Sequence, residues 1–182
     1  MCCRMRRGAE LLVLATLGIF SVLDACASPA EHAIEKKRLI DVRAPSPEGG
    51  PNAVRRHIET LRVAIDGGAD IDAADEYGNT PLFNAAFRAA WTYHDWGAND
   101  IVAYLLLRGA DPNRMQEQME MTPLHMAALS LYPNVDLVGL LCAAGGNSRT
   151  KRAVPEAASA YELSRLSEFA ELRTAFENCL PK

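Results

Sequence analysis

From residue 53 onward, two short motifs recur and separate apolar stretches that have a helical period. A glycine-led triplet occurs as Gly68-Ala69-Asp70 and Gly109-Ala110-Asp111, and more loosely as Gly145-Gly146-Asn147. Between them, Thr80-Pro81-Leu82 returns as Thr122-Pro123-Leu124. The apolar residues before each glycine are spaced by three and four, which places them on one face of a helix. Recurrence of this kind predicts a repeat protein, in which each unit buries its apolar face against the next.

The residue types in these motifs predict where each helix begins and ends. A glycine directly after an apolar helix adopts the left-handed conformation that stops the helix without a Cβ penalty. The Asp or Asn that follows favours a turn, because its side chain bonds to nearby backbone groups. Thr before Pro starts the next helix, since the hydroxyl caps free N–H groups and proline at the first helical position has no N–H to leave unpaired. Each unit therefore runs as Thr-Pro, helix, loop, helix, Gly and turn.

This pattern resembles the ankyrin repeat, whose signature includes Thr-Pro-Leu-His-x-Ala. Residues 122–127 match every specified position, residues 80–85 miss only the His, and residues 75–79 fit the turn that precedes the motif in this family. The resemblance covers about residues 53–180 and implies an all-α solenoid of stacked helix-turn-helix units with short turn fingers. It also implies a structural rather than a catalytic role for His125, which in this family fixes the turn by hydrogen bonding. The residues assigned to the structural motif are Thr80, Pro81, Leu82, Thr122, Pro123, Leu124, His125, Gly68 and Gly109.

The repeats depart from the family pattern at three places. Thr80 and Thr122 are 42 residues apart, against about 33 in the family, and most of the excess lies around residues 91–99. Glu120 stands where the first finger has a glycine, which predicts a distorted second finger. The last unit, residues 159–180, lacks Thr-Pro-Leu, as terminal repeats commonly do because one of their faces meets water. We predict a tether with a short helix and a Pro/Gly-rich loop over residues 26–52, an N-terminal cap over 53–74, repeats over 75–114 and 115–150, and a C-terminal cap over 151–182.

The first 25 residues have the features of an export signal. Three arginines precede residues 11–22, an apolar run of 12 residues that is too short for a membrane span of about 20. Residues 23–26, Leu-Asp-Ala-Cys, also resemble a bacterial lipobox, in which the cysteine is lipidated and becomes the first residue of the mature protein. Two processing interpretations stay open: lipid on Cys26, or cleavage before Ser28. The sequence thus predicts an exported protein, in the periplasm or anchored to the bacterial envelope as a lipoprotein, or alternatively secreted.

Export would place Cys142 and Cys179 in an oxidising compartment, where disulfides form and persist. One interpretation is a disulfide between them, and the other is two buried thiols on neighbouring helices. We expect the thiols, because the repeat register aligns Cys179 with Ala144 rather than with Cys142. Bridging requires Cα atoms within about 7 Å, and this offset separates the two cysteines along their helices.

Repeat proteins offer their turn fingers and concave helix faces to partners, and three segments carry candidate contact residues. The insertion holds aromatic residues of the kind that dominate binding hot spots, although they also suit a longer helix folded back on the neighbouring repeat. The second finger holds methionines, which make adaptable contacts but also fit a mobile surface loop. The first finger is acidic and suits either a basic partner or a solvated turn. The candidates are Trp91, Tyr93, His94 and Trp96 in the insertion, Glu76, Tyr77 and Asn79 in the first finger, and Met115, Met119 and Met121 in the second.

Patterns that indicate catalysis or a cofactor are missing from the sequence. There is no Gly-rich phosphate loop, no nucleophile elbow and no Cys or His cluster of the zinc type. A formal net charge of -4 gives no reason to expect a nucleic-acid partner. We therefore expect no cofactor, no metal and no catalytic residue, and contact with a membrane only through lipid on Cys26.

The resemblance implies that the protein binds another, unidentified protein, and we expect the protein itself to be a monomer. Within that class, an inhibitor or immunity-type partner that covers a toxin or an enzyme is one interpretation. A lipid-anchored structural or assembly scaffold is the alternative, followed by a secreted effector and then by an enzyme.

Overall fold

The computed structural model describes residues 50–91, 97–151 and 158–179 of the 182-residue chain. These ranges are helical, and the only β-type pairings within them are two isolated bridges, Gln116 with Met121 and Lys151 with Ser159. The helices are α3 (Gly50–Asp66), α4 (Pro81–Trp91), α5 (Ala98–Leu107), α6 (Pro123–Ala128), α7 (Val135–Ala143), α8 (Ala160–Leu166) and α9 (Ala170–Asn178).

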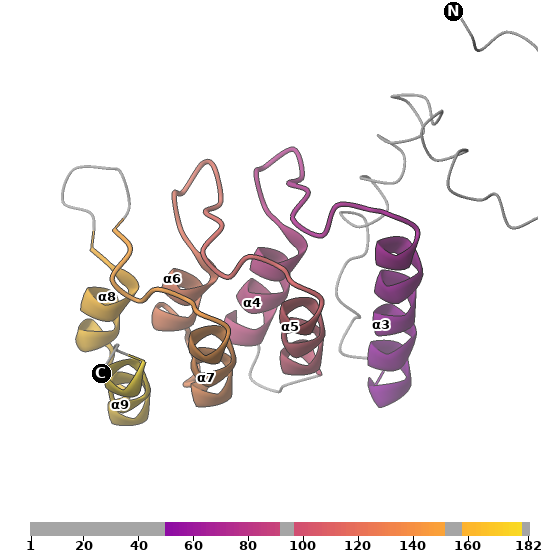
Figure 1. The fold of residues 1–182 in the computed structure, drawn as a ribbon. Coiled ribbons are helices and arrows are strands. Elements are labelled where there is room, and N and C mark those ends of the chain that lie inside the picture. The colour runs from indigo at the N-terminus through magenta and orange to yellow at the C-terminus, as the bar shows by residue number, and fades with distance from the viewer. Residues whose placement is uncertain (1–49, 92–96, 152–157, 180–182) are drawn as a thin grey trace, which may run out of the picture. The chain divides into compact units, whose positions relative to one another are not determined.

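The helices alternate between two rows (Figure 1). In the first row α4 packs on α6 and α6 on α8, and in the second row α3, α5, α7 and α9 pack on one another in chain order. Each first-row helix also packs on the second-row helix that follows it in the chain. The core lies between the rows, where Leu82, Leu105, Leu124, Leu137 and Leu141 are fully buried. This is the solenoid of stacked helix pairs that the repeats predict.

Side-chain caps begin the three first-row helices. The hydroxyl of Thr80 accepts the N–H of Phe83 at 3.1 Å. At α6, the N–H of Thr122 donates to Nδ1 of His125 at 3.1 Å, and the Thr122 hydroxyl lies 2.8 Å from the same nitrogen. At α8 a glutamate replaces the histidine: Ser159 accepts the N–H of Glu162 at 3.2 Å, and the Glu162 carboxylate accepts from Ser159. A single threonine at α4 and two different side-chain pairs at α6 and α8 thus start the helices at the same place in each repeat.

The second-row helices α3, α5 and α7 end at glycines in the left-handed region, with φ of 89°, 94° and 89° at Gly68, Gly109 and Gly145. The start of α3 differs from the predicted boundary. We expected a loop through Asn52, whereas α3 begins at Gly50. Proline is tolerated in the first turn of a helix, because the N–H it lacks has no partner there. Pro51 therefore starts this helix rather than preventing it.

The second finger keeps the left-handed residue of the first although a glutamate replaces the glycine, but its turn is one residue longer. The Gly78 N–H donates three residues back, to the carbonyl of Asp75, whereas the Glu120 N–H donates four residues back. Glu120 has a φ of 53°, close to the 75° of Gly78, and its N–H donates to the carbonyl of Gln116 at 2.9 Å. A left-handed conformation costs a residue with a Cβ roughly 1 kcal/mol, which the surrounding finger offsets. The finger differs instead in length, because 13 positions separate Gly109 from Thr122 and 12 separate Gly68 from Thr80.

A disulfide joins Cys142, in the last turn of α7, to Cys179, the residue that follows α9. Our expectation of two free thiols is therefore wrong, and both cysteines are half-buried rather than buried. The two Cα atoms are 5.5 Å apart, because α7 and α9 lie side by side. An offset of two residues amounts to only about 3 Å along a helix axis. The repeat register was a poor guide because a disulfide spans that offset easily.

Replacing both cysteines by serine should lower the free energy of unfolding by about 3–4 kcal/mol, because the bridge closes a long loop in the unfolded chain. The sequence separation of the bridged residues is 37. Urea unfolding followed by circular dichroism, with and without a reductant, measures the difference. The reductant should weaken the natural protein by a similar amount and leave the Cys142→Ser/Cys179→Ser variant unchanged. Equal unfolding midpoints in all four samples would show that the bridge does not stabilise the fold.

Candidate protein-binding surface

The first finger is held by the carboxylate of Asp75. Its Oδ1 accepts the N–H groups of Tyr77 and Asn79 at 2.9 and 2.8 Å, and its Oδ2 accepts the Asn79 amide at 3.0 Å. Burial raises the pKa of Asp75, but the hydrogen bonds from Asn79 and Tyr77 outweigh it and bring that pKa below its usual value. Asp75 and half-buried Asn79 therefore build the turn, and Glu76 and Tyr77 project from it. The Tyr77 side chain is 57% exposed.

Lateral hydrogen bonds join neighbouring fingers at the same position in each repeat. The carboxylate of Asp72 accepts the N–H of Asp111 at 3.1 Å. One repeat further on, the side-chain oxygen of Asn113 accepts the N–H of Asn147 at 2.7 Å, and its amide donates to the carbonyl of Gly145 at 3.0 Å. These polar residues hold neighbouring fingers together, so we assign them a structural role rather than a role in binding.

Gln116 ties the second finger to the first. Its side chain is buried, its amide nitrogen donates to the carbonyl of Tyr77, and its oxygen accepts the N–H of Met119. Of the three methionines proposed from the sequence, Met119 is exposed, and Met115 and Met121 are half-buried. Tyr77 and Met119 are thus the large exposed apolar groups of two adjacent fingers. The sequence interpretation missed Gln116, because nothing in the local pattern distinguishes it from a solvated glutamine.

Of the insertion around residues 91–99, the structure describes Trp91 at its start and residues 97–99, where α5 begins. Trp91 ends α4, and its ring stacks on that of Phe87, one helical turn earlier, with centroids 5.6 Å apart and an interplanar angle of 16°. Both rings are exposed. Trp91 therefore extends the helix, as one interpretation predicted, and its ring stacks on a side chain of its own helix. The other insertion candidates, Tyr93, His94 and Trp96, lie outside the described residues.

Three exposed apolar side chains occupy the same position relative to the caps of the three first-row helices, and Leu129 is the residue directly after α6. Phe87, Leu129 and Leu166 each lie seven residues after the residue that caps their helix. Their exposed fractions are 41%, 37% and 81%. Because α4 packs on α6 and α6 on α8, equivalent positions on these helices are neighbours in space. We call these three residues the apolar row.

More apolar groups lie beside the row at the C-terminal ends of its helices. Trp91 follows Phe87, and the exposed Leu131 and Tyr132 follow Leu129. The loop after α6 is held against the end of α4, because the amide of Asn134 donates to the Ala89 carbonyl at 2.9 Å. Contiguous exposed apolar groups mark interaction sites more often than scattered ones do. On the second row, the large exposed apolar residues Val63, Leu107 and Val135 do not share a repeat position.

The apolar row was not among the candidates predicted from the sequence, which were drawn from the fingers and the insertion. The signal was nevertheless present. In α4 the buried residues fall at 81–83, 85–86 and 89–90, so the seventh residue after the cap faces away from the core. A phenylalanine or leucine at that position in three successive units is the pattern that indicates the row.

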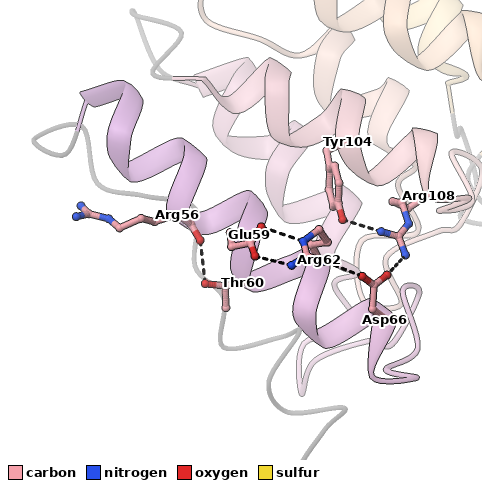
Figure 2. Close-up of polar contacts among 7 residues, drawn as sticks. All are labelled: Arg56, Glu59, Thr60, Arg62, Asp66, Tyr104 and Arg108. Atoms are coloured by element: carbon pink, nitrogen blue, oxygen red, sulfur yellow. Dashed lines mark hydrogen bonds and ion pairs between the residues drawn. The ribbon is translucent and has the colours of Figure 1, made fainter. Parts of the chain in front are cut away.

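The charged side chains at the end of α3 are engaged with one another and with α5 (Figure 2). The guanidinium of Arg62 contacts Glu59 at 2.6 Å and Asp66 at 3.1 Å. Arg108 contacts Asp66 at 2.5 Å and donates to the Tyr104 hydroxyl at 2.9 Å. The hydrogen bond from Arg108 lowers the pKa of Asp66. Exposed pairs of this kind each add little stability. Because these side chains bind one another and join α3 to α5, the cluster is not a candidate binding site.

His125 invites a catalytic interpretation, but it is buried and its Nδ1 is occupied by Thr122. Across the described ranges, no group of three or more His, Cys, Asp or Glu side chains is placed to hold a metal ion. None of the helices in those ranges is both long enough and apolar enough to cross a membrane.

Comparison with known families agrees with this geometry. Residues 53–90 match the family model described as ankyrin repeats (many copies), and residues 77–116 match the model described as ankyrin repeat. The two matches run from α3 through α5 and into the second finger. The fold is therefore an all-α ankyrin-repeat solenoid. Ankyrin repeats indicate a protein–protein interaction module and imply a protein partner, and proteins built from them are generally not catalytic.

His57 of α3 is a half-buried histidine whose pKa is shifted well below its ordinary value. Burial, with the positive charge of Arg88 on α4, lowers the pKa of His57 from 6.5 to about 4. In the unfolded chain this histidine regains its ordinary pKa and binds a proton that the folded protein excludes. The unfolded state therefore binds more protons between about pH 4 and pH 6.5, so acid weakens the fold in this window.

The free energy of unfolding should fall as the pH is lowered from about 6.5 to 4, and the variant His57→Gln should show a shallower fall. Urea titrations at several pH values measure both profiles. Carboxylates with a lowered pKa, such as Asp66, also weaken the fold from about pH 5 downward, so the difference between the two profiles is what reports on the histidine. Parallel profiles for the two proteins would mean that His57 does not carry the pH dependence.

Proposed function

We propose that this protein is an exported, non-catalytic binding module that holds a protein partner on its apolar row, as an inhibitor or immunity-type protein does. The observation that carries the proposal is the repetition of Phe87, Leu129 and Leu166, which remain exposed on three successive helices. Burying a fully exposed side chain of this size is worth about 1.5–3 kcal/mol. Leu166, which is 81% exposed, would gain most of that amount in an interface, and Phe87 and Leu129 would each gain somewhat less than half of it.

The dimensions of the row support a macromolecular partner. Packed helices are about 8–10 Å apart, so three equivalent positions extend over roughly 20 Å. The side chains that flank this surface, Trp91 and Tyr132, are of the residue types that dominate binding hot spots in protein interfaces. The exposed Tyr77 and Met119 of the fingers provide further contact groups for a partner that covers this side of the repeats.

Export is supported by the disulfide between Cys142 and Cys179, because such bridges are formed and kept in oxidising compartments. The arginines and the apolar run at the N-terminus provide the signal for that route. We place the mature protein in the bacterial envelope, either free in the periplasm or held at a membrane by lipid on Cys26. An acylated cysteine anchors a protein to the bilayer without a spanning helix.

Replacing Leu166 by aspartate should release the partner, whereas the same change at Leu107 should not. Leu166 is 81% exposed in the first row and Leu107 is 83% exposed in the second, so the two substitutions burden folding similarly. The measurement is affinity capture of cross-linked envelope proteins with the tagged natural chain, Leu166→Asp and Leu107→Asp. A protein retained by the natural chain and Leu107→Asp, but lost from Leu166→Asp, is the expected result. Equal retention by all three chains would exclude the apolar row as the binding surface.

The mature chain should begin near residue 26 and not at Met1, because residues 1–25 are a signal peptide in this proposal. Intact mass spectrometry of the protein from membrane and soluble fractions measures the start point. A mass beginning at Cys26 with added lipid would assign the membrane surface, and one beginning at Ser28 would assign a soluble envelope protein. An unprocessed chain recovered from the cytosol would contradict export.

A further inference from the structure

Resting on the proposed function, we infer that Asn134 is a positioning residue of the binding surface: its side chain fixes the loop between α6 and α7, residues 129–133, in the orientation that the partner meets. This loop carries Leu129 of the apolar row and the exposed Leu131 and Tyr132 beside it. The contacts of Asn134, the chemistry of its amide and the exposure of the loop support this inference.

The side chain of Asn134 bonds to three helices. Its Oδ1 accepts the N–H of Leu137 at 2.9 Å and so caps the start of α7. Its Nδ2 donates to the carbonyl of Ala89, in the last turn of α4, at 2.9 Å. It also exchanges hydrogen bonds of 3.2 and 3.1 Å with the amide of Asn99, in the first turn of α5. One side chain thus joins the end of the loop to the preceding repeat at two places.

The bond to Ala89 fixes the separation of two parts of the surface. The last carbonyls of a helix have no partner within it, so the Ala89 carbonyl takes a donor from outside α4. Ala89 lies two residues before Trp91, and Asn134 lies two residues after Tyr132. The hydrogen bond therefore holds the end of α4, with its exposed tryptophan, at a fixed distance from the loop and its exposed tyrosine.

An amide is the group that these contacts require. The Ala89 carbonyl can only accept and the Leu137 N–H can only donate, so the side chain between them needs a donor and an acceptor on separate atoms. Aspartate has the same shape, but it only accepts when it is ionised. Serine has a single polar atom, which can cap α7 but ends one bond short of the place of Nδ2. Either replacement thus keeps the cap on α7 and loses the bond to α4.

The loop itself depends on such contacts, because most of it lies in water. Its residues are exposed except for Ser130, whose buried hydroxyl has no hydrogen-bond partner within the described ranges. Segments with few buried apolar contacts open easily. A partner that meets a loop already in place avoids the entropy cost of ordering it. Asn134 therefore contributes to affinity through the loop that it holds.

Two substitutions separate this role from helix capping. Asn134→Asp keeps an acceptor for the Leu137 N–H and has no donor for the Ala89 carbonyl. Asn134→Ser also keeps the cap and adds no charge. Ser130→Ala is the control within the loop, since it removes a hydroxyl that makes no hydrogen bond in the described structure.

Three measurements on the full chain test the inference: nitrogen-15 relaxation for the backbone order parameters of residues 130–132, circular dichroism for the melting temperature, and affinity capture of the cross-linked envelope protein that Leu166→Asp loses. The natural chain and Ser130→Ala should give order parameters of about 0.85, and both Asn134 variants should fall below about 0.6. All four melting temperatures should agree within about 5 °C. Both Asn134 variants should retain about tenfold less of the partner than the natural chain, and Ser130→Ala should retain as much.

The other outcomes separate the two proposals. Unchanged order parameters in the Asn134 variants would overturn the inference, because the loop would then be held without this side chain. A mobile loop with full retention of the partner, a loss confined to Asn134→Asp, or a loss that accompanies a large drop in melting temperature would also overturn it, and each would leave the apolar row as a binding surface. If the natural chain and Leu166→Asp retain the same proteins, the proposed function fails and the inference fails with it, even where the loop becomes mobile.

Discussion

Burial of leucines between two rows of helices is the interaction on which the rest of this structure depends. No single helix pair can cover the apolar faces of its own helices, so Leu82, Leu124 and Leu141 are removed from water only when neighbouring pairs stack. Stacking in turn requires that each helix begin at the same height. The caps at Thr80, Thr122 and Ser159 meet that requirement with different side chains. The apolar row follows from the same constraint, because helices that start in register place their seventh residues side by side.

The sequence predicted most of the fold because the residues that begin and end its helices act through local physical causes. A glycine that must be left-handed, and a threonine ahead of a proline, act within a few residues, so the helix ends near Gly68 and Gly109 could be placed without tertiary information. The sequence was a weaker guide to features that depend on how separate elements pack. The Cys142–Cys179 bridge depends on how closely α7 and α9 approach, and α3 begins three residues early because Pro51 fits its first turn.

The candidate site was harder to predict than the fold. Motif reasoning led to the fingers, where Asp75 and Gln116 hold the turns by hydrogen bonds, and where the side chains of Tyr77 and Met119 are exposed. The apolar row was overlooked because each of its residues, considered alone, resembles an ordinary core leucine or phenylalanine. Only the combination of repeat position and exposure distinguishes it. Exposure is a property of the stacked helices, and the sequence of one repeat does not contain it.

The disulfide has a consequence for where the binding surface is most stable. It fastens α9 to α7 in the second row, and α8, which carries Leu166, packs on α9. The last third of the apolar row is therefore held by a bond that a reducing cytosol does not form. In a chain made in the cytosol and oxidised after export, this end of the row would gain its covalent support only outside the compartment of synthesis. The surface that carries Leu166 would then be more stable where the proposed partner is than where the chain is made.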